Sequence, residues 1–79
     1  MPRPISVELD NKQLPVRIVD DRGGKREVVR VLEVWRVDDE WWRSKIARRY
    51  IEAIMDNGSR ITLFEDQISG QWFEQTVGR

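Results

Sequence analysis

The chain has 79 residues with 14 basic and 14 acidic side chains, and it contains no His and no Cys. Disulfides, thiolate metal sites and a His general base are therefore excluded. The net charge of zero provides no whole-molecule attraction to nucleic acid or to an acidic membrane.

The length predicts one domain over residues 1–79, with residues 1–3 and 76–79 frayed. No apolar run approaches the roughly 20 residues of a membrane helix, and the amino-terminal stretch lacks the apolar core of a secretory signal. We therefore expect a cytoplasmic protein that does not contact membranes.

Two short strands are predicted in the first 19 residues. Ile5, Val7 and Leu9 alternate with polar residues, which is typical of a strand with one buried face. Residues 14–19 form the second candidate, with Pro15 at its start or on a sheet edge because proline donates no ladder hydrogen bond. Turns are expected at residues 10–13 and 20–24, which are rich in Asp, Asn and Gly.

The longest predicted strand covers residues 25–37, and its apolar residues occupy both alternating faces. Val28, Leu32 and Val34 share one parity. Val29, Val31, Trp35 and Val37 share the other. A straight strand with one wet face does not explain this pattern, so we predict a central or bent strand that contains a β-bulge.

Residues 38–45 break the strand pattern with an acidic triplet followed by two tryptophans. Asp38 or Asp39 could cap a helix, since carboxylates are favoured at the positive end of a helix dipole. The sequence therefore predicts one helical turn here. The triplet lacks the alternation of a calcium loop, so we favour a solvated turn over a metal site and expect no cofactor.

A hairpin is predicted between residues 48–56 and 59–65, with Asn57-Gly58 as a two-residue type I′ turn. That turn places Ile54 opposite Ile61 and Glu52 opposite Leu63. A short last strand is expected at residues 71–75. The sum is a mainly β fold: a small, strongly bent antiparallel sheet or an SH3-like or OB-like barrel of about six short strands with one helical turn.

The candidate binding residues combine aromatic and basic side chains at neighbouring positions. They are Trp41, Trp42, Arg43, Arg48 and Arg49. Three interpretations fit: arginines packed on tryptophans for stability, a docking surface for a protein partner, or a stacking surface for single-stranded nucleic acid. Without His or Cys, a catalytic role for this cluster is disfavoured.

Three segments carry a resemblance to a known family: VLEVWRVDDEWWR, RRYIEAIMDNGSRITLFED and SGQWF. They resemble small uncharacterised bacterial domains that occur alone or at the carboxyl end of ImuB-like proteins, which are inactive relatives of Y-family translesion DNA polymerases. The matching positions are Trp35-Arg36, Trp41-Trp42, Arg48-x-Tyr50 or Arg49-x-Ile51, Gly58, Leu63-Phe64-x-Asp66 and Gly70-x-Trp72-Phe73. Many relatives carry an aromatic-Trp-Arg-Gly segment where this chain has residues 21–24, Asp-Arg-Gly-Gly.

The resemblance implies no catalytic residue and a module associated with mutagenic DNA repair. We therefore predict a noncatalytic interaction module, monomeric or weakly self-associating, that binds an unknown protein partner linked to translesion DNA synthesis. The alternative is single-stranded nucleic-acid binding through the same tryptophans and arginines.

Overall fold

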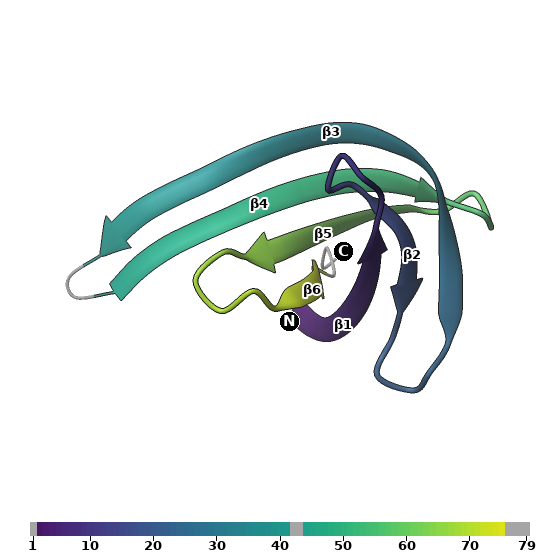
Figure 1. Cartoon of the computed structure of the whole chain (residues 1–79), viewed down its shortest axis with the longest axis horizontal. Coiled ribbons are helices and arrows are strands. Elements are labelled where there is room, and N and C mark those ends of the chain that lie inside the picture. Colours follow the sequence, from purple (N-terminus) through teal and green to yellow (C-terminus); the bar gives the residue numbers. More distant parts are fainter. Residues whose placement is uncertain (1, 42–43, 76–79) are drawn as a thin grey trace.

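The computed structural model describes residues 2–41 and 44–75, and these form a closed antiparallel barrel of six strands. The strands are β1 (Pro2–Leu9), β2 (Pro15–Val19), β3 (Lys25–Trp41), β4 (Ser44–Met55), β5 (Arg60–Asp66) and β6 (Trp72–Gln75). Each strand pairs with the next along the chain, and β6 pairs back with β1 (Figure 1). The mainly β class and the barrel are as predicted. The part of the chain that the structure describes holds no helix able to cross a membrane.

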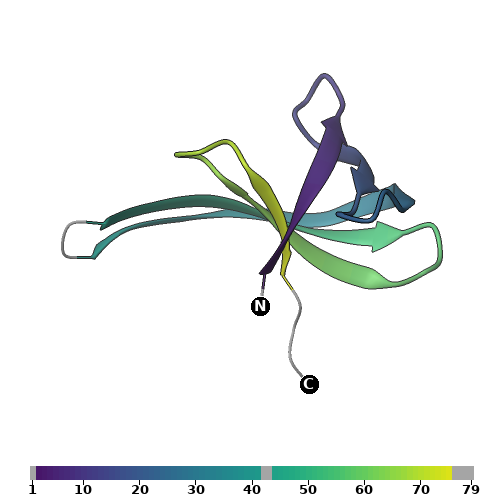
Figure 2. The same cartoon turned by 90° about the horizontal axis from the view of Figure 1, so that it is seen from below.

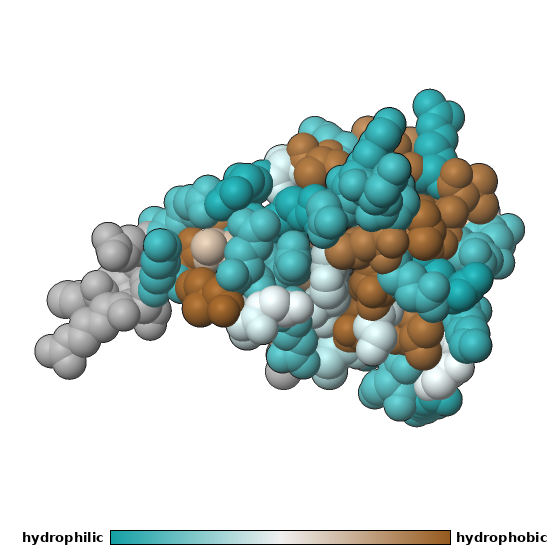
Figure 3. Space-filling model, in the orientation of Figure 1, coloured by the Kyte–Doolittle hydropathy of each residue, from teal (hydrophilic) through white to brown (hydrophobic). Residues whose placement is uncertain are grey.

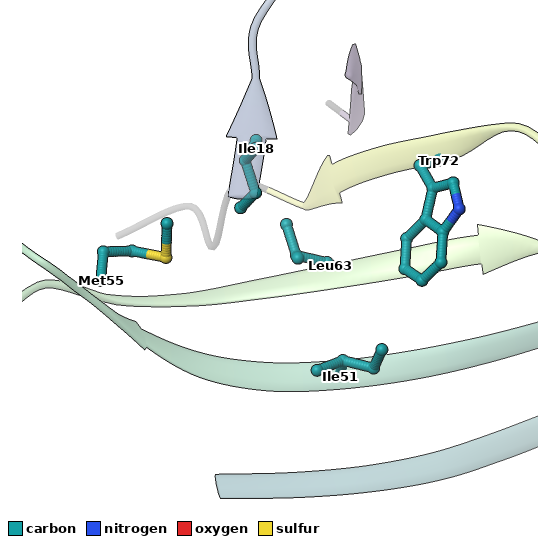
Figure 4. Close-up of a cluster of buried hydrophobic side chains, with 5 residues drawn as sticks. All are labelled: Ile18, Ile51, Met55, Leu63 and Trp72. Carbon is teal, nitrogen blue, oxygen red and sulfur yellow. The ribbon is translucent and has the colours of Figure 1, made fainter. Parts of the chain in front are cut away.

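The core consists of large side chains contributed by four of the six strands (Figure 4). They are Ile18, Ile51, Met55, Leu63 and Trp72. Partly buried aliphatic residues of β1, β3 and β5 pack around this cluster. The inner face of the barrel is thus filled by side chains, which is typical of a barrel this small.

Two β-bulges bend β3. Val29 and Leu32 are the extra residues, because the pairing of β3 with β4 skips each of them. Residues of β3 that oppose the buried positions of β4 therefore recur every third residue instead of every second. These pairs are Val28↔Met55, Val31↔Ala53 and Val34↔Ile51. The predicted bulge is confirmed, and two bulges explain why apolar residues occupy both parities of this strand.

The predicted helical turn is wrong for the described residues of segment 38–45. Asp38 and Asp39 extend β3 and pair with Ala47 and Ile46 of β4. Pairing reaches Trp41↔Ser44, so β3 has 17 residues and β4 has 12. The helix prediction rested on local capping preference, whereas the cross-strand ladder gives each of these residues a backbone partner.

The turn between β4 and β5 also differs from the prediction, because it has three residues. The Met55 amide donates to the Ser59 carbonyl (2.9 Å), and the Gly58 amide donates to the Met55 carbonyl (2.9 Å). Gly58 has φ of 86°, the left-handed conformation that closes a three-residue loop with a G1 bulge.

The extra loop residue shifts the β4–β5 register by one position. Leu63 therefore opposes Ile51 and Ile61 opposes Ala53, while Glu52 opposes Thr62. The predicted register would have set Glu52 against Leu63. Side chains alternate along a strand, so the one-residue shift places Ile51 and Leu63 together in the core.

The loops after β1 and β2 are closed by aspartates, as the sequence predicts. The Asp20 carboxylate accepts hydrogen bonds from the amides of Gly24 (2.7 Å) and Arg22 (2.9 Å). These bonds, that from Gly24 first, lower the pKa of Asp20. In the same way the Leu14 amide lowers the pKa of Asp10, because a hydrogen-bond donor stabilises the ionised carboxylate relative to the protonated carboxylic acid.

The amino-terminal end is part of the barrel. Pro2 and Arg3 pair with Gln75 and Glu74, so the expectation that these two residues fray is wrong. A further contact ties the same region together, since Arg26 of β3 forms an ion pair with Glu74 at 2.6 Å. Residues 76–79 lie outside the described residues.

Candidate interaction face

Strands β3 and β4 continue past the barrel as a two-stranded arm. The pairing of β4 with β5 ends at Arg48↔Asp66, whereas β3 and β4 stay paired to Trp41↔Ser44. We define the arm as residues 38–41 and 44–47. Figures 1 and 2 show it reaching outward from the barrel.

Arg49, one of the predicted binding residues, lies at the root of the arm and faces the barrel. Its guanidinium donates to the Gln13 carbonyl at 2.7 Å, and its Nε lies 3.6 Å from a Glu65 carboxylate oxygen. The same guanidinium lies 5.6 Å from the centre of a Trp72 ring. Arg49 therefore links three parts of the barrel.

Arg48 points to the opposite face, because adjacent residues on a strand alternate. Its guanidinium lies 4.6 Å from the centre of the Phe64 ring, and it donates to the Tyr50 hydroxyl at 3.2 Å. The two arginines that the sequence placed on one surface thus lie on different sides of the sheet.

Three further residues were predicted to bind: Trp41, Trp42 and Arg43. Trp41 ends β3 opposite Ser44. Trp42 and Arg43 lie outside the described residues.

The sequence reasoning missed a row of four aromatic rings on the outer face of the sheet. Each of the four strands β3 to β6 contributes one ring, at directly opposed positions. The rings are Trp35, Tyr50, Phe64 and Phe73, with successive centroid separations of 5.4, 5.2 and 5.0 Å. Only the strand register brings these residues together, so spacing along the chain held no signal for the row.

The row is covered in its middle and open at the β3 end. Phe64 is 2% exposed, whereas Trp35 is 37% exposed. Val37 lies two residues after Trp35 on β3 and shares its face of the sheet. It opposes Arg48 and is 39% exposed. We call Trp35, Val37, Arg48 and Tyr50 the Trp35 face.

The other exposed large apolar residues lie on β2, on β3 and in the loop between β5 and β6. Figure 3 shows apolar surface gathered over the barrel, with a smaller apolar patch near the base of the arm, all set among hydrophilic residues. The β5–β6 loop supports that base, since the Gln67 amide donates to the Ala47 carbonyl at 2.8 Å.

A cavity of about 300 Å³ lies between β1 and the loop after β2. Its lining is mostly charged: Arg3, Pro4, Ile5, Asp20, Asp21, Arg26 and Glu74. Arg26 and Glu74 neutralise each other, and the Asp20 carboxylate is engaged by loop amides. Within residues 2–41 and 44–75, no group of three or more acidic side chains is arranged to hold a metal ion.

Comparison of the chain with models of known protein families, with curated proteins and with solved structures finds no match. The geometry of the Trp35 face therefore carries the functional argument.

Proposed function

We propose that the protein is a noncatalytic interaction domain that binds a protein partner through the Trp35 face. The observation that carries this proposal is the half-open aromatic row, in which Trp35 is exposed at one end while Phe64 in the middle is buried. Trp, Tyr and Arg are the residues most enriched at interface hot spots, and this face combines all three.

Contacts within the chain preorganise the Trp35 face. Trp35 stacks on Tyr50 with an interplanar angle of 10°, and Arg48 is fixed by the Tyr50 hydroxyl and the Phe64 ring. Little side-chain entropy is then lost on binding, which favours affinity. Arg49 is left out of the binding surface because its guanidinium is engaged at the barrel.

The biological setting is proposed from the resemblance to the small bacterial domains. It points to a partner in cytoplasmic translesion DNA synthesis. Trp41, Trp42 and Arg43 stay candidates for an extension of the face, on the sequence argument alone.

The test is a titration of the domain with candidate translesion proteins, followed by fluorescence anisotropy of the labelled partner. Trp35→Ala combined with Arg48→Ala should weaken binding at least about tenfold, since hot-spot truncations cost about 2 kcal/mol or more. Val16→Ala combined with Arg22→Ala is the control, because both residues are exposed and lie outside the Trp35 face, on β2 and in the loop after it. Equal affinity of the two double variants would refute the proposed face.

Single-stranded nucleic acid is the second candidate, favoured by the near-parallel Trp35–Tyr50 stack beside a guanidinium. It predicts that oligonucleotides quench the fluorescence of the wild type, and that affinity falls steeply with salt. Trp35→Ala should abolish most of the quenching. Absence of quenching at low salt eliminates this candidate.

A further inference from the structure

One edge of β3 is open over most of its length. Strand β2 covers β3 only at Lys25–Glu27, whereas β4 pairs along the other edge from Val28 to Trp41. Among the strands that the structure describes, only β2 and β4 contact β3. Figure 1 shows β3 as the outermost strand from its bend to the end of the arm.

An open edge presents backbone amides and carbonyls in the spacing that another strand requires. Natural edges are commonly blunted by Pro, by bulges or by charged side chains, Lys above all, so the charges of this edge must be matched by any strand that pairs with it. The segment Glu33–Trp41 (EVWRVDDEW) contains no Pro, Gly or Lys, and it pairs with β4 without a bulge. It is thus a nine-residue regular edge with exposed Val34, Trp35 and Val37.

We infer that this edge pairs antiparallel with the same edge of a second copy of the chain, around a two-fold axis at Val37. Along one edge of a strand, only every second residue directs its amide and carbonyl outward. Two identical edges can therefore pair antiparallel around a two-fold axis only when that axis passes through a residue and not through a peptide bond. Within Glu33–Trp41 the axis at Val37 uses all nine residues.

Charge decides between the possible axes. With Val37 on the axis, Arg36 of each copy opposes Asp38 of the other, which gives two opposite-charge pairs. An axis at Arg36 would set Arg36 against itself and Glu33 against Asp39. An axis at Asp38 would set Arg36 against Glu40 but also Asp38 against itself, whereas the axis at Val37 creates no like-charge pair. Opposite charges across strands stabilise pairing and like charges oppose it, so Val37 is favoured.

Arg36 and Asp38 already contact each other within one chain, but this contact leaves both side chains available to pair with a second copy. Arg36 and Asp38 form an ion pair at 3.1 Å, and both side chains are more than half exposed. Such a surface pair contributes little to the fold, so it can rearrange into a four-charge cluster between copies. The zero net charge of the chain removes long-range repulsion between them.

The pairing would also join the two Trp35 faces. A two-fold axis perpendicular to the sheet keeps both outer faces on one side, so the dimer presents two copies of the aromatic row on one continuous sheet. This inference goes beyond the proposed function and does not depend on it, because the edge pairs through backbone amides and carbonyls of β3, whereas the Trp35 face binds through side chains.

Cross-linking tests the axis directly, since the chain has no native cysteine. Opposed residues of antiparallel strands have Cα atoms about 4.5–5.5 Å apart, within disulfide range. Val37→Cys should therefore give a covalent dimer on mild oxidation with oxidised glutathione, seen on a non-reducing gel. Val29→Cys is the control, because Val29 is 66% exposed on the same strand but outside the nine-residue segment. Equal cross-linking of both variants would overturn the inferred axis.

Charge exchange gives an independent test in which the strand keeps its apolar residues. Arg36→Asp alone or Asp38→Arg alone should raise the dimer dissociation constant roughly tenfold, and the double exchange should restore it. Arg22→Asp, in a loop of the barrel, matches the charge change of the first variant without touching the edge. Sedimentation equilibrium measures the constants, and thermal unfolding checks that each variant folds.

A wild type that sediments as a monomer at millimolar concentration overturns self-pairing, and so does a double exchange that fails to restore the dimer. Either result leaves partner binding at Trp35 and Arg48 unaffected. Loss of partner binding in a chain that still dimerises would instead remove the proposed function alone.

Discussion

The barrel and the arm are built from the same two long strands, yet they differ in what surrounds them. In the barrel, β4 has a neighbour on each edge, and Ile51 on its inner face is completely buried. In the arm, β3 and β4 have mainly each other, and Val37, the residue of β3 directly before the arm, is already 39% exposed. The comparison shows that apolar residues of one strand serve folding at one end and are available for binding at the other.

The barrel also explains why the arm can hold its shape. A two-stranded ribbon alone is only marginally stable in water. Here the ladder is continuous with the barrel, the Gln67 amide holds the Ala47 carbonyl, and Arg49 anchors the root through Gln13 and Glu65. The arm is thus a projection of the barrel and not a separate element.

The largest expected effect separates the two regions by burial. Ile51→Ala should lower the free energy of unfolding by about 2–5 kcal/mol, because it leaves a cavity in the core. Val37→Ala, an aliphatic truncation in an exposed part of β3, should cost less than about 1 kcal/mol. Urea unfolding followed by circular dichroism measures both. Similar losses in the two variants would contradict the division into a packed barrel and an exposed face.

The second prediction uses the neighbouring arginines on opposite faces. Arg49→Ala should cost about 1–3 kcal/mol, since it removes a charged hydrogen bond and leaves Glu65 without its cation. Arg48→Ala should cost about 1 kcal/mol or less, the range of a partly exposed cation–π contact. The same unfolding assay compares them. A costlier loss at Arg48 would reverse the assignment of Arg49 as structural and Arg48 as a binding residue.

The smallest effect concerns the loops that close the barrel. Amide donors lower the pKa of Asp20 below its usual 3.8, so its contribution to stability is present above that pH and is lost as the pH falls through the lowered value. Asp20→Asn should therefore lower the melting temperature at pH 7 more than at pH 2.

Asp21→Asn removes the same charge from the same loop without removing the two Asp20 hydrogen bonds, and it serves as the control for Asp20→Asn. An equal pH dependence of the two variants would show that net charge, and not the loop hydrogen bonds, produces the effect.

Much of the fold could be predicted from the sequence because its signals are local. Alternation located β1, Pro15 marked the start of β2, and Asp and Gly marked the loops. The mixed parity of residues 25–37 was enough to predict a bulge in β3. The helical turn at residues 38–45 was predicted on equally local grounds and was wrong, since pairing with β4 outweighs a capping preference.

The candidate site was less predictable, because it depends on register. Arg48 and Arg49 are adjacent in the sequence and were assigned to one surface, but the pleat separates them. Trp35 and Phe73 are far apart in the sequence and belong to one row, because β4 and β5 place Tyr50 and Phe64 between them. A single residue in the loop at Gly58 shifts that register.

The sequence by itself determined that this protein is made mainly of strands, in a strongly bent sheet or a small barrel, because alternating side chains and turn residues act within a few positions of each other. Only the tertiary structure decided which aromatic rings meet, which arginine is exposed and which strand edge is left open. Those outcomes depend on how strands are aligned across the sheet, and alignment follows from loop lengths and bulges whose effect reaches every residue beyond them.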